Sequence, residues 1–411
     1  MRLALSIFLV IFSSVTLAER SHTVVVISMD GLTNDAWDIA ELESFQRIQN
    51  EGIRAEFMTP VYQSTTYPGH VSMATGVHPD RHGILHNSFY DRESGFHSYP
   101  DDANLIDVPP IWVIAEQEGI TTGIYFWVGS ETQWNGWQAK YKYAPFDANI
   151  KEEEKIDQVI AWLEMPEATR PKLIMTYWDG TDSVGHIHGT KHKKIYDQMI
   201  RQDQMLGLLF SRLEEINAWD YVTLLLVSDH GMIDVNQYIS LKSILDTLEI
   251  DYILSAGPAV AHVFIDDKDH RSQALKLLSS QDHMAVYDRV NLPKSFHMDH
   301  PSRTGDIIVT TEPPYMFNNN PAGGPKGMHG YDPNLSEMHA IFGAIGFEVR
   351  NERIGPISHD RCSAHNSKIT GDKVCQAHAG KGYRFKPKEL GHHPSIKIVA
   401  GFSAFSQIGV L

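Results

Sequence analysis

The chain has almost no cysteine, because Cys362 and Cys375 are the only two in 411 residues. Two cysteines allow at most one bridge, which excludes a small fold held together by a disulfide framework. Hydrophobic residues make up 42% of the chain. We therefore expect stability to come from a large apolar core, in one large α/β domain or two smaller ones.

Long hydrophobic runs are equally scarce. The one at residues 3–15 follows Arg2 and precedes Thr16-Leu17-Ala18, which is the pattern of a secretory signal peptide with small residues at its cleavage site. The run is shorter than the roughly 20 residues that a membrane span requires. We predict cleavage after Ala18 and export to the periplasm or the medium, with no transmembrane segment.

Positive charge is also deficient. Lys and Arg number 35 against 51 Asp and Glu, which gives a net charge of −16. A protein with this negative charge is not expected to coat nucleic acids, because proteins that do so neutralise the phosphates with Lys and Arg. A phosphate ester can still bind if metal ions supply positive charge locally.

Continuous β-branched and apolar runs are the clearest signs of secondary structure. Residues 23–29, 172–177 and 221–228 are typical of buried parallel strands. Shorter strands are expected at 55–58 and 121–126, and helices up to about Asn50 and over 109–116, 151–163 and 197–216. The aromatic-rich segment 134–146 has no strong period and is predicted to be a loop, in which Tyr143 is either a core residue or a platform for a ligand.

Acidic and imidazole side chains follow the predicted strands. Asp30 ends the first, and Asp229 with His230 ends the third. Ligands gather at the carboxyl ends of strands in open α/β sheets. Asp30 alone would also suit a turn, whereas adjacent Asp and His are hard to explain structurally. Asp182 and His186, after the second strand, are four residues apart and would share one face of a helical turn.

A hydroxyl-rich stretch, Ser64-Thr65-Thr66-Tyr67-Pro68-Gly69-His70, precedes a predicted helix that starts at Pro68. The free N–H groups and dipole of a helix N-terminus suit a phosphoryl or sulfuryl group. The same pattern also describes a plain N-cap. The candidates Asp30, Asp182, His186, Asp229 and His230 are joined by His329, and such nitrogen and oxygen ligands suit Zn²⁺.

In their order, these motifs resemble the nucleotide pyrophosphatase/phosphodiesterase family of the alkaline phosphatase superfamily. The match runs from about Thr23 to Phe347. Its blocks are Met29-Asp30-Gly31, Thr66-Tyr67-Pro68-Gly69-His70, His82-Gly83-Ile84 with Asn87, Pro110-Ile111-Trp112, Phe126-Trp127, Asp182-Ser183-Val184-Gly185-His186, Ser228-Asp229-His230-Gly231-Met232 and His329-Gly330-Tyr331-Asp332.

The resemblance implies an α/β, alkaline-phosphatase-like domain over residues 19–350, with a mostly parallel central sheet flanked by helices. It implies two zinc ions, one held by Asp30, Asp229 and His230 beside Thr66, the other by Asp182, His186 and His329. Thr66 would be the nucleophile, forming a covalent phosphothreonine ester. The Asn87 side chain and the Tyr67 backbone N–H would hold the non-bridging oxygens.

The implied activity is hydrolysis of nucleotide pyrophosphates or phosphodiesters to nucleoside monophosphates. Tyr67 stands where the family often has Phe, which keeps an aromatic face for the substrate, and Tyr143 is a second candidate for contact with it. Asn87, in place of a cationic clamp, favours a diester over a monoester. The alternatives are a lipid phosphodiesterase, a phosphomonoesterase, or a non-catalytic exported binding protein.

Residues 351–411 do not fit this pattern. They hold nine Lys or Arg against four Asp or Glu, and their apolar periodicity fades where the family usually ends in an amphipathic helix. One hypothesis is a reading-frame shift near Ile357, which would make both cysteines accidental. The alternative is a genuine basic extension that binds a partner or a surface.

Overall fold

An eight-stranded mixed sheet forms the centre of the computed structural model, which describes residues 21–320 and 323–359. Its strands in spatial order are β19 (Glu352–Ile354), β2 (Ile53–Ala55), β18 (Phe342–Gly346), β9 (Val222–Val227), β1 (Thr23–Met29), β8 (Leu173–Trp178), β6 (Thr122–Tyr125) and β7 (Tyr141–Tyr143). All neighbours pair in parallel except β18, which is antiparallel to β2 and β9. The predicted α/β architecture with a mostly parallel central sheet is confirmed.

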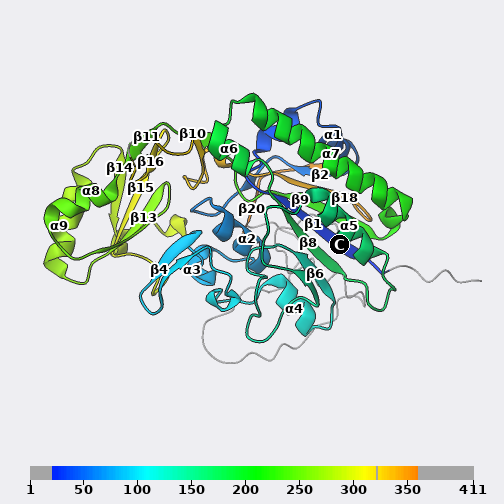
Figure 1. The fold of residues 1–411 in the computed structure, drawn as a ribbon, viewed down its shortest axis with the longest axis horizontal. Helices are drawn as coiled ribbons and strands as arrows, with labels where there is room; N and C mark the ends of the chain where they lie inside the picture. Colours follow the sequence, from blue (N-terminus) through cyan, green and yellow to red (C-terminus); the bar gives the residue numbers. More distant parts are fainter. Residues whose placement is uncertain (1–20, 321–322, 360–411) are drawn as a thin grey trace, which may run out of the picture.

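Helices cover both faces of this sheet (Figure 1). Each face of the sheet has its own hydrophobic core, and β1 contributes to both. Val25 and Ile27 pack into the first core, while Val24 and Val26 pack into the second. The first core is covered by α1 (Glu43–Glu51), α5 (Glu152–Leu163) and α7 (Lys193–Glu215), and the second by α2 (Thr66–Thr75) and α4 (Ile111–Gln117).

A smaller antiparallel sheet lies to the side of the central one (Figure 1, yellow-green). Its strands in order are β12 (Ile253–Ala256), β13 (Val260–Phe264), β15 (Ile307–Thr311) and β14 (Met284–Asp288). It packs its own core against α8 (Leu241–Leu245) and α9 (Lys268–Ser279). The other elements are α3 (Pro79–His82), α6 (Asp182–His188), and the strand pairs β3 (Met58–Thr59) with β20 (Ile357–Ser358), β4 (Ser88–Asp91) with β5 (Gly95–Ser98), β10 (Ile233–Asp234) with β17 (Gly327–Met328), and β11 (Gln237–Ile239) with β16 (Tyr315–Phe317).

Two predictions of secondary structure are wrong. The strand expected at 55–58 is split, because β2 ends at Ala55 in the central sheet and β3 begins at Met58 beside β20. Within the loop expected at 134–146, residues 141–143 form edge strand β7 beside β6. Three residues are too few to show a period of two, so the pairing comes from the neighbouring strand rather than from the local pattern.

The fold continues past residue 350, because β19 and β20 pair with β2 and β3. The predicted signal peptide (1–18) and the rest of the atypical tail (360–411), with both cysteines, lie outside the described residues. Within the described residues, no helix is both long enough and apolar enough to cross a membrane.

Candidate active site

The carboxyl ends of β1, β8 and β9 meet at one edge of the central sheet, and Asp30, Asp182 and Asp229 follow these ends directly or after a short turn. The turn before α6 is held against β1, because the N–H groups of Thr181 and Asp182 donate to the carbonyl of Asp30 at 2.9 and 3.2 Å. At Gly180, whose φ is +57°, a Cβ would lie 2.1 Å from that same carbonyl oxygen, so glycine is required there.

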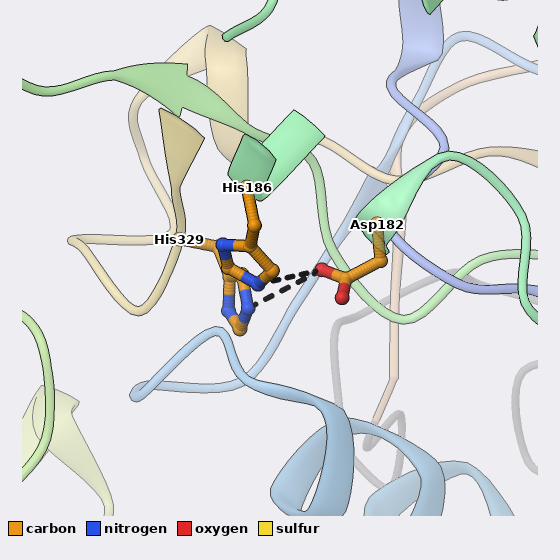
Figure 2. A group of neighbouring side chains, drawn as sticks. All are labelled: Asp182, His186 and His329. Carbon is orange, nitrogen blue, oxygen red and sulfur yellow. Dashed lines mark ion pairs between the residues drawn. The ribbon is translucent and has the colours of Figure 1, made fainter. Parts of the chain in front are cut away.

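One group of potential metal ligands joins α6 to the segment after β17 (Figure 2). Oδ1 of Asp182 lies 3.2 Å from Nε2 of His186 and 3.4 Å from Nε2 of His329. The helical spacing predicted for Asp182 and His186 is present in α6. His329 comes from a distant part of the chain, which the spacing of residues along the sequence could not place.

The other predicted ligands lie beside this group. Nε2 of His230 is 3.1 Å from Oδ2 of Asp229 and 3.5 Å from Oδ1 of Asp30. One ligand atom each from Asp30, Asp182 and His230 also lie within 4.8 Å of one another. The structure thus brings all six predicted ligand side chains into one continuous cluster.

The imidazoles are oriented for metal binding. Nδ1 of His186, His230 and His329 lies 2.9, 2.9 and 3.0 Å from the carbonyl oxygens of Gly327, Gly231 and Ser64, respectively. A carbonyl can only accept a hydrogen bond, so Nδ1 of each ring carries a proton, and Nε2, which faces the carboxylates, is the atom available to bind a metal ion once it is deprotonated.

Three buried carboxylate oxygens support the same conclusion. Oδ1 of Asp30, Oδ1 of Asp182 and Oδ2 of Asp229 have no hydrogen-bond partner among the described residues. Such groups are costly unless a cation compensates them. Nitrogen lone pairs and unpaired carboxylate oxygens that face one another across a few ångströms fit divalent cations such as Zn²⁺.

Burial and the short distances between charged groups shift the pKa values in the cluster. Burial, with the negative charges of Asp229 and Asp182, raises the pKa of Asp30 well above its usual value. Burial opposes ionisation of Asp229 too, but the imidazoles of His230 and His70 hold its pKa below the usual range. Burial, together with the neighbouring His230, lowers the pKa of His329.

Thr66 is the first residue of α2, so the helix begins two residues before the predicted Pro68, with Thr65 as its N-cap. Its Oγ1 lies 3.4 Å from Nε2 of His230. The start of the helix is fixed by the buried His70, whose Nδ1 is 2.8 Å from the Thr66 carbonyl and whose Nε2 is 2.8 Å from Ser28 Oγ. Thr66 therefore sits at the edge of the ligand cluster.

Asn87 lies beside Thr66 in the cavity wall. Its Oδ1 accepts a 2.8 Å hydrogen bond from the backbone N–H of Tyr67. This contact assigns the oxygen of the amide and leaves Nδ2 as a free donor. The two groups predicted to hold substrate oxygens are thus bonded to each other.

The cluster opens into a cavity of about 740 Å³. Among the described residues, no Lys or Arg lines it. Its apolar and aromatic wall consists of Tyr67, Tyr99, Phe126, Val128, Phe146, Tyr177, Pro258, Met316, Phe317 and Met328. This size and mixed lining are typical of a pocket for a small molecule.

Tyr143 does not belong to this wall. Its ring stacks on Tyr125 at 4.5 Å, and its hydroxyl donates to Gln158 on α5. Sequence reasoning missed Tyr177 instead, which contacts Asp30 from the second-last residue of β8. The position of Tyr177 at the carboxyl end of a buried strand was the available signal.

Comparisons with known proteins give the family of the chain. Residues 24–332 match the family described as type I phosphodiesterase / nucleotide pyrophosphatase. The chain is 29% identical over 322 residues to human ectonucleotide pyrophosphatase/phosphodiesterase family member 1, covering 74% of this chain and 35% of that protein. It is 27% identical over 347 residues to human bis(5'-adenosyl)-triphosphatase, covering 82% of this chain and 75% of that protein.

A solved structure shares the fold. Murine ectonucleotide pyrophosphatase/phosphodiesterase 5, as an inactive threonine-to-alanine variant in complex with AMP, superposes with a TM-score of 0.76 at 25% identity. The match covers 82% of this chain and 92% of that one. The chain thus spans nearly all of this neighbour but about a third of human family member 1.

Proposed function

The chain belongs to the type I phosphodiesterase / nucleotide pyrophosphatase family, and from this we propose that it is a two-metal hydrolase that converts nucleotide pyrophosphates or phosphodiesters to nucleoside monophosphates. The observation that carries the proposal is the cluster of three imidazoles and three unpaired carboxylate oxygens beside the Thr66 hydroxyl.

Asp30, Asp229 and His230 would hold one metal ion, and Asp182, His186 and His329 the other. Zn²⁺ suits these ligands, although metal supply also decides the occupant. When bound, the ions supply positive charge that lowers the pKa of a neighbouring hydroxyl and offsets charge on a leaving oxygen.

Thr66 is the proposed nucleophile. Its Oγ1 attacks phosphorus and forms a phosphothreonine ester as the leaving group departs. Water then hydrolyses the ester, which restores the threonine. Among the described residues, two hydroxyl side chains in the cavity wall contact the ligand cluster: that of Tyr177 is bonded to Asp30, whereas Thr66 Oγ1 lies 3.4 Å from Nε2 of His230.

Asn87 is the proposed donor to the phosphoryl group. Because its Oδ1 is held by the Tyr67 N–H, its Nδ2 is directed to another acceptor, and a non-bridging oxygen of the substrate would serve. The Tyr67 N–H then acts by orienting Asn87, a smaller role than direct contact with the substrate. A fixed donor of this kind stabilises charge that develops in the transition state.

The cavity wall supports a diester substrate. A phosphate monoester carries one more negative charge than a diester, and the described residues of the wall include no Lys or Arg to neutralise it. The rings of Tyr67, Tyr99 and Phe146 provide aromatic surface for a nucleobase. The AMP bound to the murine neighbour is a nucleoside monophosphate, the proposed product here. The apolar wall would also suit a lipid chain, so lipid phosphodiesters are the second candidate.

Relative rates on a pair of chromogenic esters test the proposal. We expect the zinc-loaded protein to hydrolyse the nitrophenyl ester of thymidine monophosphate much faster than nitrophenyl phosphate, and Thr66→Ala to abolish both activities. Faster cleavage of the monoester would place the protein among phosphatases. Hydrolysis of nitrophenyl phosphorylcholine alone would favour the lipid candidate. Export and the signal peptide stay predictions, tested by sequencing the N-terminus of the mature protein.

A further inference from the structure

A second cavity, of about 400 Å³, lies between the small sheet and the loop before α2. Among the described residues, it shares no lining residue with the active-site cavity. Five aromatic side chains line it: Tyr62, Tyr287, Phe296, Tyr315 and Tyr331. They come from five separate segments of the chain, so the fold itself assembles the site.

The rings pack against one another and hold the cavity's shape. Phe296 stacks on Tyr62 with ring centroids 4.5 Å apart and meets Tyr287 edge-on at 5.5 Å. Tyr331 is fully buried, and its hydroxyl donates to the carbonyl of Tyr315 at 2.8 Å. The aromatic surface is thus pre-formed.

Two carboxylates complete the lining, Glu312 and Asp332. Among the described residues, neither has a Lys, Arg or His partner within 4.0 Å. Oδ1 of Asp332 accepts from the N–H and side-chain amide of Asn334, which fixes its orientation. The single imidazole in the wall, His283, stacks on Tyr315 and lies 3.0 Å from its hydroxyl.

Both carboxylates influence the aromatic lining. Burial raises the pKa of Tyr62 above its usual value, and the negative charge of Asp332, the neighbouring Tyr287 and the negative charge of Glu312 add to this shift. The lining therefore combines two carboxylates that have no basic partner among the described residues with aromatic rings whose faces are also electronegative.

We propose that this second cavity binds a small organic cation with an alkylated ammonium group. Ring faces attract such cations, and desolvated aromatic sites do so more strongly than exposed ones. Carboxylates at the rim add attraction over a longer range. An anion would be repelled by Glu312 and Asp332, and a neutral ligand would leave both unpaired.

Two contacts through Ser64 connect the lining of this cavity to the proposed active site. Ser64 donates through Oγ to the carbonyl of Tyr331 at 2.8 Å, and His329 Nδ1 is 3.0 Å from the Ser64 carbonyl. Tyr62 and Tyr331 are thus linked to the segments that carry Thr66 and His329. This position separates the cation from the reacting groups, so its binding is measured independently of hydrolysis.

Calorimetric titration of the full chain with choline tests the proposal. We expect saturable binding that 3,3-dimethylbutan-1-ol, a neutral molecule of the same shape, fails to reproduce. Glu312→Gln and Phe296→Leu should each weaken choline binding about tenfold. Tyr143→Leu, which removes an aromatic ring outside both cavities, is the matched control and should leave it unchanged.

Three results with choline would overturn the proposal, and a fourth with Ca²⁺ would do the same. These are absence of saturable binding, equal affinity for the neutral alcohol, and choline binding that both variants leave intact, which would place the cation in the active-site cavity. Binding of Ca²⁺ instead of choline, lost in Glu312→Gln, would also overturn it. Because Glu312 is exposed, its replacement by Gln is compatible with folding, which thermal unfolding of each variant verifies.

Discussion

The hydroxyl of Tyr177 donates a 2.6 Å hydrogen bond to Oδ2 of Asp30, whose Oδ1 has no hydrogen-bond partner in the described part of the chain. Both side chains are buried at the cavity wall, which limits the competition of solvent for the bond. Tyr177 thereby orients Oδ1 towards His230, 3.5 Å away. We interpret this tyrosine as a group that positions a proposed metal ligand.

Tyr177→Phe should therefore weaken metal binding while the fold is retained. Loss of a hydrogen bond to a ligating carboxylate costs about 10–100-fold in metal affinity or activity. Competition with a zinc-sensitive chelator measures the affinity. Tyr143→Phe removes a hydroxyl that bonds only to Gln158 and is the matched control. Equal affinities in the two variants would contradict the positioning role.

Asn87→Ala should reduce kcat about 10²–10³-fold with little change in KM, because a donor aimed at charge in the transition state is lost. Steady-state kinetics on the thymidine ester measure both constants. A rise in KM with kcat unchanged would instead assign Asn87 to substrate binding.

Asp182→Asn should lower the metal content from two ions to one per chain. Asp182 Oδ1 faces the Nε2 atoms of both His186 and His329, so the substitution removes the shared carboxylate of that group. Elemental analysis after dialysis against zinc counts the ions. Two retained ions, or none, would contradict two separable sites.

Stability should fall as the pH falls below about 6.5. The buried His82 is neutral, because Ile84 N–H donates to its Nδ1 and its Nε2 lies 2.8 Å from Ser72 Oγ. Burial lowers its pKa to about 3, and burial lowers that of His262 to about 3 as well. The unfolded chain, with histidine pKa values near 6.5, therefore binds more protons than the folded chain in this pH range, which favours unfolding.

Each of these histidines should lower the free energy of unfolding by about 1.4 kcal/mol for every unit by which the pH falls between roughly pH 6.5 and pH 3. Urea unfolding at pH 7, 6 and 5 gives the slope. In His82→Gln the slope of the unfolding free energy against pH should decrease by the equivalent of about one bound proton. An unchanged slope would show that His82 does not cause the acid sensitivity.

The strands and the motif residues could be predicted because their signals are local. The runs that became β1, β8 and β9 are apolar on both faces, so Asp30 and Asp229 stand out at their ends. His329 was a candidate from its residue type, but its contact with Asp182 could not be predicted from spacing, since the two residues lie far apart in sequence.

The roles of Tyr177 and Tyr143 could not be separated in this way. Both are aromatic residues near strand ends, and only the pairing of β7 at the sheet edge turns Tyr143 away from the cavity. The second cavity could not be predicted either, because its five rings come from segments that lie apart in the sequence and no local pattern indicates that they meet. Long-range packing, which local patterns do not encode, decides such positions.

The configuration at phosphorus tests the central claim, that Thr66 forms a covalent ester, most directly. A chiral phosphorothioate diester of thymidine would be hydrolysed in ¹⁸O-water and the product's configuration determined. Two successive displacements, by Thr66 and then by water, predict overall retention. Inversion would mean that water attacks phosphorus directly, and it would contradict Thr66 as the nucleophile.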